Sequence, residues 1–467
     1  MKIKFQHHLK ASKNTLLIPI CEADKKTALA SIAENEEVPL HFLKNFNATP
    51  GATLLIAGQS APNVYLLGLG EQLTFGNLVQ AFRSFAFRQK KQLTPHLGIS
   101  LLHDNATQLN PSLIAEAASN GLLLGTYDIG LYKTEKNLLH PLRHRTASLS
   151  FWCPRPEATA CRKAVEKGSA MAHTQLSIFD LVNAPGNKAQ PIDLANWAKA
   201  SGKKYGYKVK VWNKNQIEAN GFHALLAVNR GSEYPPSFIQ CEYLPKQYKG
   251  TLPKIGLAGK GVTFDTGGLS IKGHANMHFM KSDMGGAAAV LGAMELCAKL
   301  QLPVHLIGLV PSTDNCVDAK SVKPGDVIDS YSGKTIEVID TDAEGRLILA
   351  DALAYLEKQY QPDIMIDLAT LTGSTVRALG YQAGALFTNH DGLAQTLIAA
   401  GEKTDERLWR LPLWDAYKKD VESDMADVRN FSGRPVAGAI SAAKFLEVFT
   451  AQHPKWAHLD IAGVAFG

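Results

Sequence analysis

Three short segments of the chain place acidic and basic side chains next to glycines. They cover residues 259–272, 281–286 and 340–346. Glycine allows the backbone to take positive φ angles and to approach a bound ligand closely. These segments are therefore the first candidates for a catalytic or metal-binding site, and they contribute the carboxylates of Asp265, Asp283, Asp342 and Glu344.

These four carboxylates are suited to binding divalent metal ions. Gathered at one site they would repel one another unless cations neutralised them, and hard divalent metals with oxygen ligands do so. Asp342 and Glu344 are two residues apart, so in an extended chain their side chains point the same way. Two ions about 3.5–4 Å apart can polarise a carbonyl group and generate hydroxide at neutral pH. We expect the four groups to converge, each from a junction between a strand and a helix.

Each carboxylate also has a simpler structural interpretation. An aspartate after a strand often caps a helix, and an acidic side chain in the first turn of a helix is stabilised by the helix dipole. For one isolated carboxylate this is the more frequent role. Three glycine-rich segments with the same chemistry in one part of the chain favour the metal site.

Other common catalytic motifs do not fit the sequence. A phosphate-binding loop needs the pattern GxxxxGK[ST], whereas Lys260 is followed directly by Gly261 and the required hydroxyl is missing. Neither HExxH nor GxSxG occurs, which argues against a single-zinc helical site and a serine-hydrolase elbow. His274 and His278 are four residues apart but fall in an expected loop, so we interpret them as bystanders.

The elements around these segments have the order of an α/β protein. Strand-like runs alternate with helical ones, which indicates a largely parallel sheet with its ligand site at the carboxyl ends of the strands. We expect strands at 254–258, 304–310, 363–368 and 456–461, and helices at 284–300, 345–359 and 437–449.

The first third has the same alternation but no cluster of candidate catalytic groups. We expect strands at 53–57, 64–68 and 97–101, and helices at 77–90, 111–124 and 157–174. The last of these helices is long enough to join two domains. The predicted fold is α/β with two domains, each a mostly parallel or mixed sheet flanked by helices. The expected limits are 1–155 for an outer, non-catalytic domain, 156–178 for a linking helix and 179–467 for a catalytic domain.

Composition sets the broad class. The 467 residues exceed the usual size of one domain, and 45% hydrophobic with 20% charged residues is ordinary for a globular protein. The six cysteines are scattered and form no CxxC pair, which favours free thiols in a reducing compartment. The N-terminus lacks a signal-peptide pattern, and no apolar run is long enough to span a membrane. We expect a cytoplasmic protein without a membrane partner.

The net charge of +6 is spread along the chain, and its densest cluster lies at 88–91. A solvated surface is the more frequent reason for such an excess, although a nucleic-acid-binding patch would carry it as well.

The three segments, in this order and spacing, closely resemble the leucine aminopeptidase family, also known as cytosol or leucyl aminopeptidases. Residues 340–347 match the signature octapeptide of that family except at its first position, where Asp340 replaces the usual asparagine. The first third matches weakly, mainly at 121–136. The strong resemblance includes 181–187, 260–272, 280–291, 324–326, 367–373, 437–440 and 458–463.

The resemblance implies two divalent ions per subunit, Mn²⁺ or Zn²⁺. The tighter ion would be held by Lys260, Asp265, Asp283 and Glu344. The more exchangeable ion would be held by Asp265, Asp342 and Glu344, with help from the main-chain carbonyl of Asp342. Lys260 would have to be neutral to act as a ligand, so the adjacent dication would have to lower its pKa greatly. Without the resemblance, an ion pair between Lys260 and the carboxylates would be the simpler interpretation.

The resemblance also implies the catalytic roles. Lys272 would polarise the scissile carbonyl, and Arg346 would hold a bicarbonate that serves as general base. The substrate's free amine would bind the exchangeable ion, and a two-metal-activated hydroxide would release the N-terminal residue of a peptide. The pocket for that residue would be apolar and would favour leucine within a broad range, its lining including Met280, Thr370, Leu371 and Gly373.

Two further expectations come from the resemblance. The first is a homohexamer with the catalytic domains inside and the first domains outside. The second is an alternative function, in which the chain has an additional or sole DNA-binding role, as some relatives bind DNA. A catalytically dead homologue is the least favoured alternative, because all seven candidate metal-site and catalytic residues are intact.

Overall fold

The computed structural model describes residues 2–6, 15–35, 39–57, 63–101, 110–135, 139–246, 248 and 250–465. The chain divides into two compact units, one of residues 1–176 with 403–405 and one of residues 177–402 with 406–467. The division falls inside α5 (Ala158–Asn183), which extends nine residues beyond the predicted helix at 157–174. None of the described helices is long and apolar enough to cross a membrane.

The first unit is built on a six-stranded sheet. All its strand pairs are parallel except the pair at one edge, between β3 and β4. In spatial order the strands are β1 (Lys2–Gln6), β6 (Ser148–Trp152), β5 (His96–Ser100), β2 (Thr15–Cys21), β4 (Val64–Gly70) and β3 (Thr53–Ile56).

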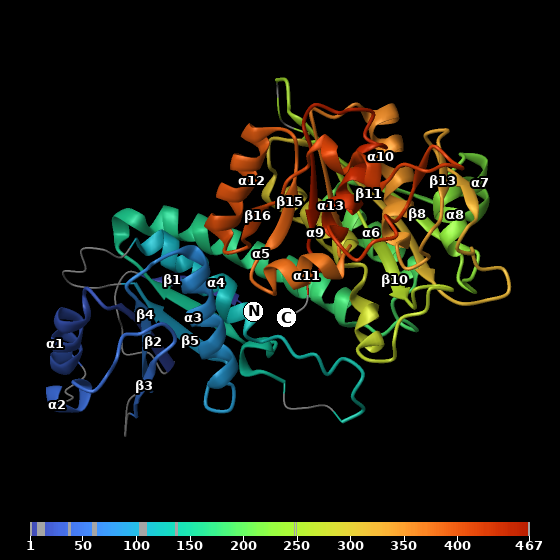
Figure 1. Cartoon of the computed structure of the whole chain (residues 1–467). Helices are drawn as coiled ribbons and strands as arrows, with labels where there is room; N and C mark the ends of the chain where they lie inside the picture. Colours follow the sequence, from blue (N-terminus) through green and yellow to red (C-terminus); the bar gives the residue numbers. More distant parts are fainter. Residues whose placement is uncertain are drawn as a thin grey trace. The chain divides into compact units, whose positions relative to one another are not determined.

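Helices cover both faces of this sheet (Figure 1). Side chains alternate between the faces of a strand, and in β4 Leu66 packs in the apolar cluster that contains residues of α1 and α2, whereas Leu67 packs with α3 and α4. A strand buried on both faces needs apolar residues at successive positions, which explains the unbroken run of β4. These helices are α1 (Lys25–Asn35), α2 (Leu40–Leu43), α3 (Phe75–Arg88) and α4 (Pro111–Leu124).

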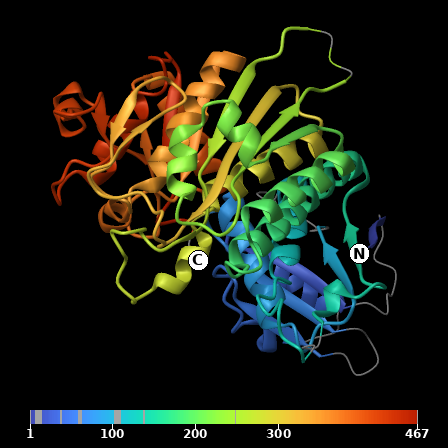
Figure 2. The same cartoon turned by 90° about the vertical axis from the view of Figure 1, so that its right-hand side faces the viewer.

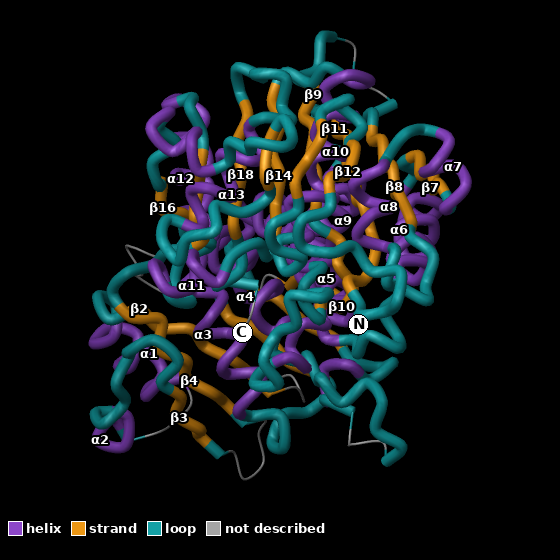
Figure 3. Tube along the Cα trace, turned by 45° about the vertical axis from the view of Figure 1, so that its right-hand side comes forward, coloured by secondary structure: helices purple, strands orange, loops and turns teal. Residues whose placement is uncertain are grey.

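The second unit is built on a larger, mixed sheet (Figure 3). The four central strands β18, β14, β9 and β11 are parallel, and antiparallel pairs flank them at β15–β18 and β8–β11. In spatial order the strands are β16 (Leu408–Arg410), β15 (Gly384–Phe387), β18 (Trp456–Asp460), β14 (Ile364–Ala369), β9 (Lys254–Gly259), β11 (His305–Asn315), β8 (Ser237–Tyr243) and β7 (Lys208–Trp212). The short strand β10 (Gly261–Asp265) pairs with the end of β11.

Two helical layers enclose this sheet (Figures 1 and 2). One layer packs against strand residues such as Ile307 and Leu309, and the other against Leu306 and Val310. The first layer contains α8 (His223–Asn229), α10 (Glu344–Tyr360) and α13 (Gly438–Glu447). The second contains α6 (Pro191–Tyr205), α9 (Gly285–Leu300) and α12 (Asp391–Thr404).

The remaining described elements are short. They include α7 (Lys214–Ala219), α11 (Gly373–Leu379) and a small sheet of β12 (Val327–Asp329), β13 (Thr335–Glu337) and β17 (Val428–Arg429). The predicted α/β class is confirmed, with mixed sheets. The predicted strand at 304–310 is too short, because β11 continues to Asn315 and so reaches the segment that carries Asp265.

Candidate metal centre

The first glycine-rich segment places Lys260 and Asp265 beside the central strands. Lys260 lies between β9 and β10, where its backbone N–H donates to the Leu368 carbonyl at 3.0 Å and its carbonyl accepts from Ala287 N at 2.9 Å. Asp265 is the last residue of β10. Gly267 and Gly268 follow with φ of 86° and 61°, angles that favour glycine, and this turn returns the chain toward Lys272.

The second segment differs from the expectation. Asp283 does not follow a strand but lies between a 3₁₀ turn at Met277–Ser282 and α9. Thr370 Oγ1 donates a hydrogen bond of 2.7 Å to Asp283 Oδ1. The carboxylate is therefore oriented by the loop after β14, a segment almost ninety residues away along the chain.

The third segment also corrects a prediction. Residues 342–344 are not extended: Asp342 lies in a turn, Ala343 has φ −108° and ψ 40°, and Glu344 is the first residue of α10. The argument from the two-residue spacing is therefore wrong. The carboxylates nevertheless converge, because oxygens of Asp265, Asp342 and Glu344 all lie within 4.8 Å of one another.

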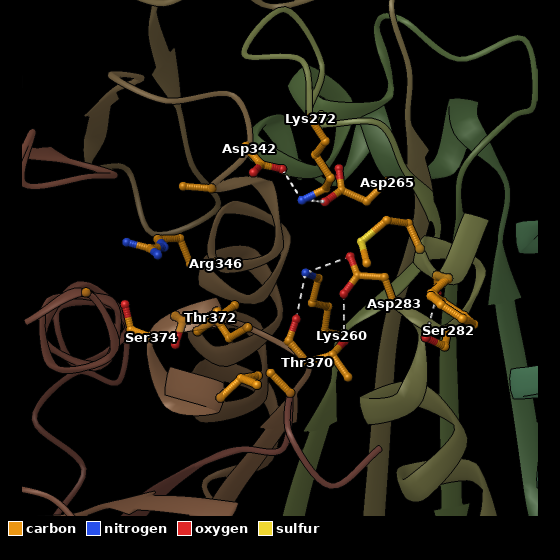
Figure 4. A pocket seen from close by; sticks show the side chains of 18 of the residues that line it. Lys260, Asp265, Lys272, Ser282, Asp283, Asp342, Arg346, Thr370, Thr372 and Ser374 are labelled. Atoms are coloured by element: carbon orange, nitrogen blue, oxygen red, sulfur yellow. Dashed lines mark hydrogen bonds and ion pairs between the residues drawn. The ribbon is translucent and has the colours of Figure 1, made fainter. Parts of the chain in front are cut away.

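Two lysines connect the carboxylates (Figure 4). Lys260 Nζ lies 2.8 Å from Asp283 Oδ2 and 2.9 Å from Glu344 Oε1. Lys272 Nζ lies 2.8 Å from Asp265 Oδ2 and forms a second ion pair with Asp342. All four predicted acidic residues and both predicted lysines are thus in one cluster.

Burial and mutual repulsion shift the acid–base behaviour of the cluster. Burial first, and then the charges of Asp265 and Glu344, raise the pKa of Asp342 to about 7. Burial likewise raises the pKa of Asp283 and of Glu344. For Lys260, burial lowers the pKa, but the charges of the neighbouring carboxylates outweigh it and the pKa is raised. Four carboxylates face only two ammonium groups. The positive charge nearby is therefore too small to offset the burial and mutual repulsion that raise these pKa values.

The donor atoms fit hard divalent cations. Four carboxylate oxygens are buried and have no hydrogen-bond partner among the described residues: Asp283 Oδ2, Asp342 Oδ1 and both oxygens of Glu344. Three of these four oxygens contact lysine ammonium groups only as ion pairs. A buried carboxylate oxygen without a partner is costly, and coordination of a dication would satisfy these oxygens. Among the described residues, neither His274 nor His278 belongs to the group formed by Asp265, Asp342 and Glu344.

A cavity of about 670 Å³ opens beside the cluster. Its lining includes Lys260, Asp265, Lys272, Asp283 and Asp342, whereas Glu344 is buried and is not one of the lining residues. The residues predicted for the substrate pocket also line this cavity: Met280, Thr370, Leu371 and Gly373.

Arg346 lines the same cavity from the first turn of α10. Its side chain is almost fully buried, and Nη1 donates a hydrogen bond of 2.6 Å to the carbonyl of Asn430. Burial lowers the pKa of Arg346 to about 10, so the group stays charged at neutral pH. Its Nε makes no hydrogen bond within the part of the chain that the structure describes.

Three polar residues hold the site together and were not assigned from the sequence. Asn315 Nδ2 donates to Asp265 Oδ1 at 2.8 Å. The buried Asn430 donates to the Asp340 carbonyl at 2.6 Å and accepts from Ile339 N at 2.8 Å, which fixes the turn before α10. No local signal distinguishes these asparagines from those of ordinary loops.

Asp460 is the third of these residues, and it organises the wall formed by residues 370–375. Its Oδ1 accepts from the backbone of Leu371 at 3.2 Å, and its Oδ2 accepts from the hydroxyls of Thr372 and Thr375 at 2.7 and 2.6 Å. Its position inside the motif at 458–463 was the one sequence signal that could have identified it.

Comparison with known proteins identifies the family of this chain. The model of the cytosol aminopeptidase family, catalytic domain, matches residues 178–467. A "Probable cytosol aminopeptidase" of Chloroherpeton thalassium is 41% identical over 97% of this chain and 92% of its own length. The corresponding protein of Chlorobium luteolum is 43% identical over 97% of this chain and 91% of its own length.

A solved structure is similar over almost the same range. The bottromycin maturation enzyme BotP in complex with Mn superposes with a TM-score of 0.85 at 31% identity, covering 98% of this chain and 94% of BotP. The family model, the sequence relatives and this structural similarity together show that the chain belongs to the cytosol aminopeptidase family.

Proposed function

We propose that this protein is a metal-dependent aminopeptidase that removes the N-terminal residue from peptides, with a leucine-like but broad preference. The observation that carries the proposal is the convergence of Asp265, Asp342 and Glu344 within 4.8 Å, next to the ion pair of Lys260 and Asp283. Family membership supports the same reaction class.

The proposed metal ligands are those that the family resemblance implies. Lys260, Asp265, Asp283 and Glu344 would hold one ion, and Asp265, Asp342 and Glu344 would hold the other. Mn²⁺ or Zn²⁺ would fit, and the related BotP is known in complex with Mn. Two such dications supply Lewis acidity toward a carbonyl oxygen and a source of hydroxide at neutral pH.

Lys272 is suited to stabilise negative charge on the substrate. Its side chain is 23% exposed and lines the cavity, so its ammonium group is within reach of a bound peptide. A hydrogen bond from Nζ to the carbonyl oxygen under attack would stabilise the oxyanion of the tetrahedral intermediate.

Arg346 is suited to hold an anion close to the cluster. It lies in the first turn of α10, where the helix dipole favours negative charge, and its Nε remains available for a hydrogen bond. Every carboxylate of the cluster would be a metal ligand, so an external base is needed, and bicarbonate held by Arg346 would supply it.

The pocket for the first residue is proposed to be lined by Met280, Thr370, Leu371 and Gly373, which all border the cavity. An apolar pocket separates aliphatic residues by only about 1–3 kcal/mol. Leucine and methionine would therefore be favoured without excluding similar residues.

A chelator experiment tests the proposal. Protein stripped with a chelator should lose hydrolysis of a leucyl chromogenic amide, and added Mn²⁺ or Zn²⁺ should restore it. The control is the same stripped protein with Mg²⁺ or Ca²⁺, which bind oxygen ligands but are poorer matches for a lysine nitrogen. Full activity in the presence of excess chelator would refute metal dependence.

Assembly and location follow the same family argument. We propose a homohexamer in the cytoplasm, with residues 179–467 as catalytic domain, 156–178 as linking helix and 1–155 as the outer, non-catalytic domain. Light scattering tests the assembly, and a mass near the 50.6 kDa of one chain would contradict it. Within this chain the DNA-binding alternative is supported only by the net charge of +6, and the absence of any salt-sensitive gel shift would end it.

A further inference from the structure

We infer that Arg377 recognises a carboxylate of the peptide substrate beside the proposed pocket for the first residue. This inference rests on the proposed aminopeptidase function and specifies its substrate class. Arg377 is a residue of α11 and lines the same cavity as Lys260, Asp265 and Lys272.

The guanidinium group of Arg377 folds back over the first turn of its own helix. Its Nη2 donates a hydrogen bond of 2.9 Å to Ser374 Oγ, and Ser374 is labelled in Figure 4. Its Nη1 lies 3.5 Å from the position that a Cβ atom on Gly373 would occupy. Gly373 is one of the four proposed pocket residues, so the positive charge lies directly against that wall.

The segment that carries Arg377 is held in place at its start. Thr372 caps α11 by accepting from Thr375 N at 3.2 Å, and Asp460 accepts hydrogen bonds from the hydroxyls of both threonines. A recognition group on an anchored element loses less conformational entropy on binding than one on a free loop. The helix that carries Arg377 is therefore anchored, and the hydrogen bond to Ser374 holds its exposed side chain at the cavity.

Arg377 also has unused hydrogen-bonding capacity. The only contact of its guanidinium with a hydrogen-bond acceptor among the described residues is the one to Ser374, and no described carboxylate forms an ion pair with it. Arginine has five N–H donors in a planar fork that matches a carboxylate. The nearby acidic groups of the cavity are instead paired with Lys260 and Lys272.

A substrate carboxylate could reach this cation from two sources. One is the side chain of an N-terminal glutamate or aspartate, which the position of Nη1 over Gly373 favours. The other is the terminal carboxylate of a dipeptide. A purely apolar pocket would reject an acidic side chain, because an unpaired charge is costly to desolvate. Arg377 offsets that cost, and the enzyme is expected to accept acidic peptides as well as leucine-like ones.

The test compares substrates that differ only in a carboxylate. kcat/KM of the metal-loaded full-length protein is measured for glutamyl and leucyl chromogenic amides, and for Leu-Gly and its C-terminal amide. Arg377→Met should lower the glutamyl-to-leucyl ratio by about tenfold, the effect of one charged hydrogen-bonding pair that is partly screened by water. If Arg377→Met lowers only the ratio of kcat/KM for Leu-Gly to kcat/KM for its amide, the recognised carboxylate is instead the C-terminal carboxylate of the substrate.

Two further variants serve as controls. Arg377→Lys keeps the charge but not the fork and should give an intermediate ratio. Arg230→Met removes an exposed arginine that does not line the cavity, and should leave both ratios unchanged. Thermal unfolding of each variant checks that the fold is retained.

The outcomes separate the inference from the function on which it rests. If Arg377→Met hydrolyses the leucyl amide with both ratios unchanged, the inference is overturned and the aminopeptidase proposal stands. If the unmodified, metal-loaded protein hydrolyses none of the four substrates, the proposed function itself is refuted.

Discussion

Lys260 Nζ and Glu344 Oε1 lie 2.9 Å apart in the interior, although their residues are 84 positions apart in the sequence. Gly345 makes this contact possible, because a Cβ atom at that position would lie 2.6 Å from Lys260 Nζ. Any larger residue at 345 would have to displace the lysine. The pairing of these two residues therefore depends on the glycine that follows Glu344 in the third segment.

Glu344→Ala should abolish turnover and metal retention. Loss of residues that merely orient metal ligands costs about 10–100-fold in affinity or activity, and loss of a residue proposed to hold both ions should cost more than about 100-fold. The leucyl amide assay and the metal content after dialysis measure the effect. Glu218→Ala, on the exposed part of α7, is the matched control. Near-normal turnover of Glu344→Ala would show that the ligand assignment is wrong.

Metal affinity should fall as the pH decreases from about 8 to 6. Asp342 has a pKa of about 7 in the metal-free protein, so at pH 6 it is mostly protonated and must release its proton before it can bind a cation. The proton of Asp342 adds at most about tenfold per pH unit to the loss of affinity, on top of the proton that Lys260 must release at every pH in this range to act as a ligand. Calorimetry of Mn²⁺ binding in two buffers of different ionisation enthalpy counts the protons released at each pH. A proton count that does not rise between pH 8 and pH 6 would contradict the prediction.

Asp340→Asn should be well tolerated. Asp340 Oδ1 accepts a hydrogen bond of 2.8 Å from Asp342 N, and the side-chain oxygen of asparagine can do the same. Asp340→Ala loses this bond and should lower the free energy of unfolding by about 1 kcal/mol. Urea denaturation of the two variants distinguishes them. Equal losses would mean that the charge of Asp340, which favours the charged form of Arg346, matters more than the bond.

Asp460→Asn should weaken both the fold and the pocket wall. The substituted amide nitrogen cannot accept from the hydroxyls of Thr372 and Thr375, so we expect a loss of about 1–3 kcal/mol in the free energy of unfolding. A raised KM for leucyl amide should accompany it, since Thr370 and Leu371 precede the anchored turn. As a control, Asp391→Asn should change neither quantity, because the side chain of Asp391 is 81% exposed. An unchanged KM in Asp460→Asn would indicate that the wall does not depend on Asp460.

The sequence determined most elements, the candidate site residues and the family of this protein. Glycine-bounded carboxylates and alternating apolar runs are local signals, and they predicted α9, α10, β14 and β18 to within one or two residues. The signature segments carried the family resemblance because their residue types and spacing are specific. The sequence predicted local conformation less well. Asp342 lies in a turn and not in an extended segment, and β11 continues beyond its predicted end.

Only the tertiary structure decided which groups meet. Asp283 is oriented by Thr370, the turn before α10 by Asn430, and the wall of the cavity by Asp460, and each of these partners is more than eighty residues away along the chain. Such pairings depend on strand order and helix packing, which no local periodicity encodes. The position of Arg377 over Gly373 has a different origin, because a helix brings residues four apart to the same face. Its place in the cavity still required the fold, since only the sheet and its loops bring that face and the carboxylate cluster to the same cavity.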